Sequence, residues 1–467
     1  MTSLLDGCTP WPEEFVDHYW ASGHWRGSTL DNLLRGWALQ YGPRTALVHG
    51  DARLTYAQLN RRADRMAAGF RGRGLRPGMR VVVQLPNVPE FVVTAFALMR
   101  AGLVPVFCPL SHREPEVPEL VRAAQAVGYV GPSTDQDFDH TAMAADIAAR
   151  WPFLRRVFTY EAPGTESPFG GLTTDPSNCQ YAPLGSLDAP PCPALPQRAG
   201  QVAFLLVTDG TALVPRTHDD FAHQATAAAA LLPLTEEDVY LAALPADRDL
   251  ALGGPGIIGA LSAGATVVLA DSPDPADCLP LLARERVTVT ALTADAAARW
   301  LDAGAAPATL RLAQLIGSPP DPATAERLGA ALGCRVQQVF GTPEGLLTLT
   351  RPCAPDAAAL ATHGRPLSPD DQIRLVDAAG DPVPDGTTGE LLARGPHTVR
   401  GYYRAPDRDA RAFTPDGYLR TGHLAHRTPD GDLVVTGRRD DAGRTPPGHP
   451  RPPIRPARPR PDPKGTA

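Results

Sequence analysis

Residues 81–108 read VVVQLPNVPEFVVTAFALMRAGLVPVFC, and this stretch decides the fold. Its apolar start predicts a buried strand at 81–85. Pro89 is typical of the first turn of a helix, and Asn87 could cap that helix. A second apolar strand is predicted at 104–108. A strand, a helix and a strand in this order form a βαβ unit, which indicates a parallel sheet.

The same alternation continues on both sides of this unit. Upstream, the apolar spacing within residues 29–78 predicts two amphipathic helices, with a strand pair at 46–49 and 53–55 between them. Downstream, strands and helices alternate from Val202 to about Glu344. The predicted fold class is therefore α/β, a large domain of mixed and parallel sheets flanked by helices.

The ends of the pattern suggest domain boundaries. Residues 1–365 are expected to form the core, and the short strands and turns of residues 366–440 predict a β-rich subdomain of the same core. Residues 163–200, rich in Pro, Gly, Ser and Thr, are expected to form a surface connection. Residues 441–467 contain nine of the 51 prolines and no apolar period, so a disordered Pro/Arg-rich tail is expected there.

Composition and charge exclude several classes of protein. Hydrophobic residues make up 43% of the chain, enough to bury a large core, which excludes global disorder. The formal net charge of -7, with no basic stripe before residue 440, argues against a nucleic-acid partner. The longest apolar run, 91–99, is too short for a membrane span, and no secretory signal is visible. Seven Cys without a CxxC pair suit a reducing compartment, so a cytoplasmic location is expected.

One motif invites a dinucleotide interpretation. Gly254-Pro-Gly256-Ile-Ile-Gly259 matches the pattern G-x-G-x-x-G. A dinucleotide site needs this pattern directly after a strand and before a full helix. Residues 246–252 do not form a clean strand, and the following helix is short. Close packing of helices is the favoured interpretation, and a dinucleotide oxidoreductase is kept as an alternative of another class.

Two strand ends carry residues suited to a nucleotide. After the strand at 203–207, the hydroxyl and glycine residues from Thr208 to Thr211 would let backbone N–H groups approach phosphate, although a simple polar turn would look the same. After the strand at 336–340, Phe340 could stack on a purine and Glu344 could hold Mg²⁺. A strand-end turn with a solvated glutamate is the alternative there.

Glycine-containing turns then follow in a fixed order toward the C-terminus. They are Gly386-Thr-Thr-Gly389-Glu390-Leu391, Arg394-Gly395-Pro396, Gly401-Tyr-Tyr403, Gly417-Tyr-Leu-Arg-Thr-Gly-His423 and Gly437-Arg438. Further cues are Trp11-Pro-Glu-Glu-Phe15, Gln84-Leu-Pro-Asn87, Pro109-Leu-Ser-His-Arg113, Pro215-Arg-Thr-His-Asp-Asp220 and Gln338-Val-Phe-Gly341. From about residue 10 to 441, this order resembles the adenylate-forming (AMP-binding) superfamily, in particular stand-alone aryl-acid–AMP ligases of the 2,3-dihydroxybenzoate and salicylate type.

The resemblance implies a reaction and its ligands. Such ligases convert ATP and an aryl carboxylic acid to aryl-AMP and pyrophosphate, and load the aryl group onto a carrier-protein thiol in siderophore and nonribosomal peptide biosynthesis. The implied cofactors are ATP and Mg²⁺. The implied partners are a small aryl or amino-aryl acid and a carrier-protein domain. The protein mainly positions the reactants and neutralises phosphate charge.

The resemblance also implies roles for individual residues. Thr208 and Glu344 would be catalytic, and Glu344 would hold the metal. Four residues would line the acid pocket: Arg248, Asp249, Leu250 and Gly254. The nucleotide would lie against a larger set: Thr208, Gly210, Thr211, Gly317, Ser318, Pro319, Val339, Phe340, Gly341, Thr342, Glu344, His423 and Arg438.

Three departures from the family pattern fall on this chemistry. The phosphate loop, from Thr208 to Pro215, is about three or four residues shorter than the family's and has no lysine. His423 stands where the family has a ribose-binding aspartate, and an imidazole accepts at most one hydrogen bond. Asp249 stands where the aryl ligases have an amide. It would suit an amino-bearing substrate, or it would pair with Arg248.

The family's mobile C-terminal domain, which delivers a lysine to the reacting carboxylate, is expected to be absent beyond Asp441. With that lysine and the phosphate loop both affected, we expect the chain to be a weak or inactive aryl-acid–AMP ligase. The alternative is a non-catalytic homologue, a pseudoenzyme or scaffold that binds a small acid, a nucleotide or a pathway partner.

Overall fold

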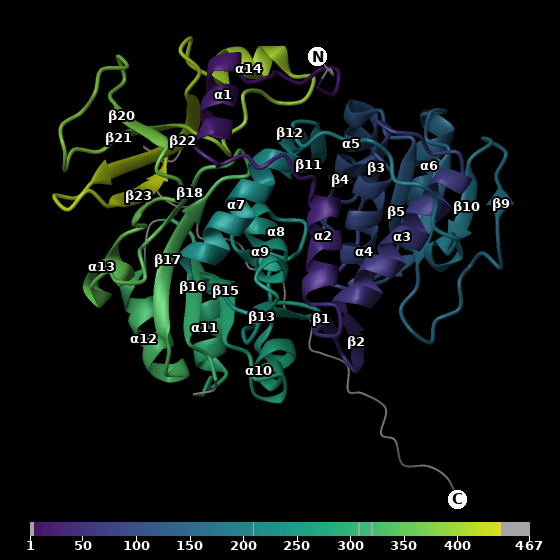
Figure 1. Ribbon diagram of the computed structural model, residues 1–467, viewed down its shortest axis with the longest axis horizontal. Coiled ribbons are helices and arrows are strands. Elements are labelled where there is room, and N and C mark those ends of the chain that lie inside the picture. Colours follow the sequence, from purple (N-terminus) through teal and green to yellow (C-terminus); the bar gives the residue numbers. More distant parts are fainter. Residues whose placement is uncertain (1–3, 209, 307–308, 319–320, 440–467) are drawn as a thin grey trace, which may run out of the picture.

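Two large β-sheets with helices on their faces, and one small sheet, make up the fold (Figure 1). The computed structural model describes residues 4–208, 210–306, 309–318 and 321–439. The predicted α/β class is confirmed. The predicted tail, 441–467, lies outside the described residues.

The predicted βαβ unit lies inside the eight-stranded sheet. Its two strands pair in parallel, and the helix α4 (Pro89–Arg100) connects them. Across the sheet the strands are β12 (Ala212–Thr217), β11 (Val202–Thr208), β4 (Val104–Phe107), β3 (Arg80–Val83), β5 (Gly128–Pro132), β8 (Arg156–Tyr160), β10 (Gln180–Pro183) and β9 (Thr173–Thr174). One face packs on α3 (Tyr56–Gly72) and α4 (Pro89–Arg100), and the other on α5 (Glu116–Ala124) and α6 (His140–Arg150).

The prediction that residues 163–200 form only a surface connection is wrong in part. The strand β10 pairs in parallel with β8, and it buries Tyr181 and Ala182. A short 3₁₀ helix, Leu184–Leu187, follows and packs on α3. Because many Pro and Gly residues surround it, the apolar segment that completes the sheet was not predicted from the sequence.

The nine-stranded sheet has a parallel centre and antiparallel edges. In order it contains β19 (Arg365–Pro366), β18 (Leu347–Leu349), β17 (Arg335–Gly341), β16 (Leu312–Ile316), β15 (Val289–Thr293), β13 (Val239–Ala242), β14 (Thr266–Leu269), β1 (Thr45–His49) and β2 (Ala52–Thr55). Its outer face packs on α10 (Pro275–Arg284), α11 (Ala294–Asp302), α12 (Pro322–Leu332) and α13 (Asp356–Ala361).

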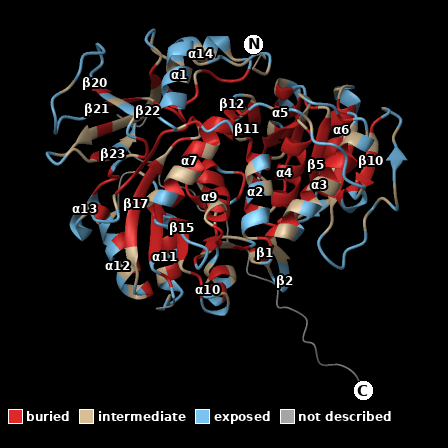
Figure 2. Cartoon of the chain, viewed as in Figure 1, coloured by how far each residue is buried: buried red, intermediate tan, exposed pale blue. Residues whose placement is uncertain are grey.

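A shared core lies between the two large sheets. It is filled from α2 (Leu30–Gln40), α7 (His218–Leu231), α8 (Asp249–Gly253) and α9 (Gly256–Ser262), together with side chains of both sheets. Figure 2 shows the buried residues concentrated along these strands and helices. At Gly259, a Cβ atom would lie 2.9 Å from the carbonyl oxygen of Ala225 on α7. The structure therefore supports close helix packing as the reason for the G-x-G-x-x-G pattern.

A four-stranded antiparallel sheet completes the fold, as the strands and turns beyond residue 365 predicted. It consists of β20 (Gln372–Val376), β21 (Gly389–Arg394), β22 (Leu419–Arg427) and β23 (Leu433–Arg438). The helices α1 (Glu13–Ala21) and α14 (Pro406–Ala412) lie near this small sheet. Elsewhere in the chain, β6 (Thr134–Asp135) and β7 (Phe138–Asp139) form a separate hairpin. Within the described part of the chain, no helix combines the length and apolar character needed to cross a membrane.

The prediction that Asn87 caps α4 is wrong. The N-cap residue is Val88, and it makes no side-chain capping bond. The Asn87 amide instead donates to the carbonyl oxygens of Ala242 and Leu244, and its oxygen accepts the N–H of Ala246. This buried side chain therefore joins the eight-stranded sheet to the loop that follows β13 in the nine-stranded sheet.

Asn87→Ala should lower the free energy of unfolding by about 2–3 kcal/mol, because three hydrogen bonds are lost and buried backbone groups are left unpaired. Urea denaturation measures the change. Asn32→Ala, at an exposed position on α2, is the matched control and should change stability little. An equal effect of the two substitutions would contradict a joining role for Asn87.

Candidate active site

Two of the residues predicted to contact adenine, Gly317 and Phe340, contact one buried histidine. The Nδ1 atom of His363 accepts the backbone N–H of Val435 at 3.1 Å. Its Nε2 atom therefore carries the proton and donates to the Gly317 carbonyl at 2.8 Å. Burial lowers the pKa of His363 to about 4, so the ring is neutral at pH 7. This neutral ring ties the end of β16 to the small sheet.

The predicted aromatic residue, Phe340, lies beside this histidine. Its ring meets those of His363 and His423 edge-on, with centroids 5.7 and 4.9 Å apart. The Phe340 side chain is only 4% exposed and packs in the core of the small sheet, so a purine could reach little more than its edge. In the β22–β23 ladder His423 lies opposite Arg438, so these predicted nucleotide residues do share one neighbourhood.

The residues that follow β16, beside the strand that carries Phe340, form the open part of the surface around His363. Gly317 is exposed, has φ of +155°, and a Cβ atom placed on it would meet nothing within 4 Å. Its N–H donates to the Val339 carbonyl at 3.2 Å, and Ser318 beside it is half-buried. The open space over Gly317 would accept a flat ring. Pro319 lies outside the described residues.

Glu344 lies in the loop that follows β17. It is 7% exposed, and its Oε1 atom accepts the Tyr402 hydroxyl at 2.7 Å. The loop is pressed against residues 397–399: a Cβ atom on Gly345, whose φ is +114°, would lie 1.6 Å from the His397 carbonyl oxygen. Thr342, which follows Gly341 at the strand end, closes the loop by donating its N–H to the Leu346 carbonyl at 2.9 Å. The carboxylate is therefore held in one position.

The described residues contain no group of three or more His, Cys, Asp or Glu that could hold a metal ion alone. Magnesium is commonly bound by one or two carboxylates and the phosphates of a nucleotide. Glu344, with a single carboxylate fixed by Tyr402, fits that arrangement and would need the phosphates to complete it.

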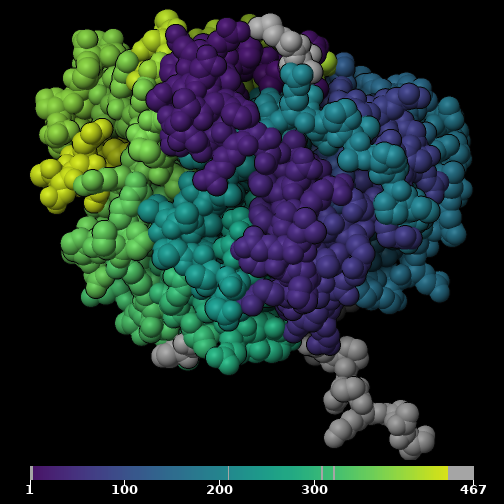
Figure 3. All heavy atoms as spheres, in the orientation of Figure 1, coloured from purple at the N-terminus to yellow at the C-terminus, as the bar shows by residue number. Residues whose placement is uncertain are grey.

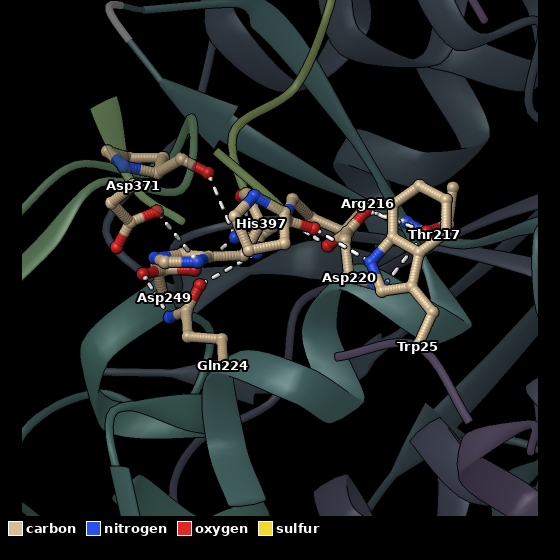
Figure 4. A network of polar contacts seen from close by, with 10 residues as sticks. Trp25, Arg216, Thr217, Asp220, Gln224, Asp249, Asp371 and His397 are labelled. Atoms are coloured by element: carbon tan, nitrogen blue, oxygen red, sulfur yellow. Dashed lines mark hydrogen bonds and ion pairs between the residues drawn. The ribbon is translucent and has the colours of Figure 1, made fainter. Parts of the chain in front are cut away.

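A buried arginine joins the elements that carry these residues (Figure 4). Arg216, at the end of β12, is fully buried and pairs with Asp220 at 2.8 Å and Asp249 at 2.6 Å. It also donates to the Gln224 side chain at 2.7 Å. Its two remaining N–H groups reach the carbonyl oxygens of Pro343 and His397 at 3.2 and 3.3 Å. The guanidinium thus holds α7, α8 and the Glu344 loop together.

The network around Arg216 includes Asp249, one of the predicted acid-pocket residues, but not Arg248. The partner of Asp249 is Arg216 rather than Arg248, and its second oxygen accepts the Gln224 amide at 2.9 Å. Burial raises the pKa of Asp249 to about 6, and the charge of Arg216 opposes that rise. The Arg248 side chain is 55% exposed and lies 3.7 Å from Asp247. Asp249 is therefore occupied within the fold, and Arg248 is turned away from it.

The other two predicted pocket residues lie at an apolar contact. A Cβ atom on Gly254 would be 2.9 Å from the Leu250 Cδ2 atom, and one on Gly341 would be equally close to it. The Leu250 side chain therefore fills the space between α8 and the end of β17. A larger residue at either position would require the Leu250 side chain to move.

The predicted phosphate loop is a tight hairpin. Thr208 pairs with Ala212 at the end of the β11–β12 ladder, and the described residues Gly210 and Thr211 lie in the turn between the two strands. Gly210 is exposed with φ of +83°, and Thr208 and Thr211 are half-buried. The hairpin is joined to the rest of the site at Leu213, which pairs with Val207 in the ladder and accepts the N–H of Tyr403 at 2.8 Å.

Sequence reasoning assigned no role to Arg216, His363 or Tyr402. A signal for Arg216 was present, because Thr217-x-x-Asp220 is a capping pattern and the structure forms the full capping box there. The pattern places the arginine just before a helix, four residues from an acid. His363 and Tyr402 have no comparable local signal, since their partners lie 46 or more residues away in the chain.

The sequence profile of the AMP-binding enzyme family matches residues 34–403. The chain belongs to the AMP-binding enzyme family. It is 39% identical to the 2,3-dihydroxybenzoate-AMP ligase of Bacillus subtilis, over 94% of this chain and 80% of that protein. It is 42% identical to the salicyl-AMP ligase / salicyl-S-ArCP synthetase of Mycobacterium tuberculosis, over 94% and 78%. The apo structure of Mycobacterium smegmatis MbtA, at 41% identity, gives a TM-score of 0.85 and covers 94% of this chain and 81% of that one. The resemblance inferred from the motifs is confirmed.

Arg216→Met should lower the free energy of unfolding by about 3–5 kcal/mol, because it strands two buried carboxyl groups. Without the cation the pKa of Asp249, already raised to about 6 by burial, should rise further. A carboxyl whose pKa is higher in the folded chain costs stability as pH rises through that value. The deficit should therefore be larger at pH 8 than at pH 5.

Urea denaturation at both pH values measures this deficit. Arg248→Met removes the neighbouring exposed arginine and should change stability by no more than about 0.5 kcal/mol at either pH. A deficit in Arg216→Met that does not depend on pH would show that the carboxyl groups are not what the arginine stabilises.

Proposed function

We propose that the chain is an aryl-acid–AMP ligase that transfers the aryl group of its adenylate to a carrier-protein thiol. Two relatives about 40% identical over more than nine-tenths of the chain have names that state aryl-acid–AMP ligase activity. The observation that carries the proposal is the position of Glu344. Its carboxylate, fixed by Tyr402, lies in the loop that follows β17, the strand that carries Phe340 and pairs in parallel with β16.

In the proposed reaction, a carboxylate oxygen of the acid attacks the α-phosphorus of ATP, and the bond to the departing pyrophosphate breaks. Gly317 and the edge of Phe340 would receive the adenine. Glu344 would hold Mg²⁺ together with the phosphates, and the ion would supply charge neutralisation there. The residues of this chain position the reactants rather than take part in covalent chemistry. A cytoplasmic location is part of the proposal, because ATP and a carrier protein would both be available there.

The neighbourhood of Asp249 favours a small acid without an ammonium group. Both of its oxygens are already bound, one by Arg216 and one by Gln224. The adjacent surface is the apolar Leu250, packed between two glycines. We therefore expect benzoate-like and salicylate-like acids to be used in preference to amino-substituted ones, which would require Asp249 to leave its partners.

The rate is proposed to be low because the phosphate turn is short. The turn offers few backbone N–H groups, and residues 208–215 include no lysine to neutralise the departing pyrophosphate. The same observation favours a second candidate, a non-catalytic homologue that binds nucleotide or acid without turnover. Pyrophosphate exchange combined with ATP-binding calorimetry separates the two, because the second candidate binds without exchange.

Glu344→Gln should reduce acid-dependent ATP–pyrophosphate exchange by about 100-fold, since one charge that acts on the triphosphate is lost. The apparent affinity for Mg²⁺ should fall in the same assay. Glu326→Gln, at an exposed position on α12, is the control and should leave exchange unchanged. Unchanged exchange in Glu344→Gln would remove Glu344 from the site.

Lengthening the phosphate turn should raise the exchange rate. We would insert three Ser, Thr or Gly residues between Thr208 and Gly210 and combine the insertion with Ala212→Lys. The change adds N–H donors and a cation, and a gain of at least about tenfold is expected. Inserting the same residues at the exposed turn of Gly380 is the control. If exchange does not rise and the variant is folded, the short turn is not what limits the rate.

A further inference from the structure

An open pocket lies at the edge of the eight-stranded sheet where four parallel strands, β3, β5, β8 and β10, begin. The residues that follow α3 form its other side. Its volume is about 370 Å³, within the usual range of about 300–1,000 Å³ for small-molecule sites. In Figure 3 the purple and blue segments that carry these elements lie on the side of the molecule opposite the green and yellow small sheet. The pocket shares no residue with the candidate active site.

Three arginines and no acidic residue are among the described residues that line this pocket. Arg73 directly follows α3, Arg155 precedes β8, and Arg156 begins that strand. None of the three forms an ion pair with a residue that the structure describes. The pocket is therefore a concentration of positive charge in a chain whose formal net charge is -7.

The Arg156 guanidinium is held in place by backbone groups. Its Nε–H donates to the Arg73 carbonyl and its Nη1 to the Arg155 carbonyl, both at 2.8 Å. Its Nη2 atom makes no hydrogen bond with a described residue, and it lies 3.6 Å from the place that a Cβ atom on Gly74 would take. Gly74 is exposed and lines the pocket. The unused N–H donors of Nη2 therefore border the pocket.

Like charges lie close to this guanidinium. Burial lowers the pKa of Arg156, and the charges of Arg155 and Arg73 lower it further. The Cys179 thiol acts in the opposite direction, but burial raises its own pKa to about 11, so it is uncharged at pH 7. Asp175, whose charge also acts on Cys179, does not line the pocket. Since arginine stays protonated in proteins, the repulsion of Arg156 by its two neighbours remains until an anion binds.

We propose that this pocket binds a small phosphate anion that carries two or more negative charges. The forked N–H donors of a guanidinium match phosphate oxygens, and the Nη2 atom of Arg156 offers two of them. The amides of Asn178 and Gln180 also line the pocket, and neither side chain is hydrogen-bonded to a described residue. A multivalent anion is favoured over a monovalent one, because it offsets the charges of both neighbours of Arg156. The site is separate from adenylation and does not depend on it.

Inorganic pyrophosphate and dimethyl phosphate are the probes, the first multivalent and the second monovalent. Each is titrated into the full chain by isothermal titration calorimetry at the same ionic strength. Mg²⁺ is left out, because without the ion the Glu344 carboxylate would repel phosphate from the candidate active site. Pyrophosphate should bind saturably with a dissociation constant in the millimolar range or below, and dimethyl phosphate at least about tenfold more weakly. Equal binding of the two, or no saturable binding of pyrophosphate, would overturn the proposal.

Variants of the lining arginines locate the site. Arg155→Gln and Arg73→Gln each remove one charge and keep the backbone carbonyl that holds Arg156. Each should weaken pyrophosphate binding about fivefold, and the two together at least about tenfold. Arg61→Gln, at an exposed position on α3, is the matched control and should bind pyrophosphate normally. Binding that is unchanged in both single variants, or weakened equally in Arg61→Gln, contradicts the proposal. If one single variant does not fold, the other still decides.

Discussion

The candidate active site depends on one buried guanidinium. Arg216 uses all five of its N–H donors: two on the carboxylates of Asp220 and Asp249, one on Gln224, and two on the carbonyl oxygens of Pro343 and His397. Burying a charge is costly unless such partners are complete. Because the partners belong to α7, α8 and two loops, the arginine fixes the position of each of these elements relative to the others, and with them the loop that carries Glu344.

The same network determines the hydrogen-bond partners of Asp249. Two carboxylates face one guanidinium, so the buried group would carry an excess negative charge if both were ionised, and burial raises the pKa of Asp249 to about 6. Gln224 reduces this cost by donating to the second oxygen of Asp249 while accepting from Arg216. Because both oxygens of Asp249 are bound in this way, this carboxylate stabilises the fold. Under the proposed function, substrate selection would fall to its neighbour Leu250, whose side chain packs against Gly254 and Gly341.

Much of the fold could be predicted from sequence because its signals are local: apolar runs predicted β3, β4 and β17, and Pro89 marked the start of α4. The position of Glu344 just after β17 followed from the same pattern. The role of Asn87 could not be predicted, because its partners lie more than 150 residues away. Arg216 likewise has partners from 4 to 181 residues distant. Which buried polar groups meet is set by tertiary packing, which the periodicity of a single segment does not contain.

The shortened phosphate turn is a local change in an otherwise connected site. The hairpin is joined to its surroundings at Leu213, which accepts the N–H of Tyr403, and the adjacent Tyr402 holds Glu344. Neither contact involves Gly210 or Thr211, so these turn residues are separate from the contacts that position the carboxylate. Arg216, at the other end of β12, is held independently by α7 and α8. Under the proposed function, a weak hold on pyrophosphate would follow from the turn alone, and the surfaces proposed for adenine and acid would keep their contacts.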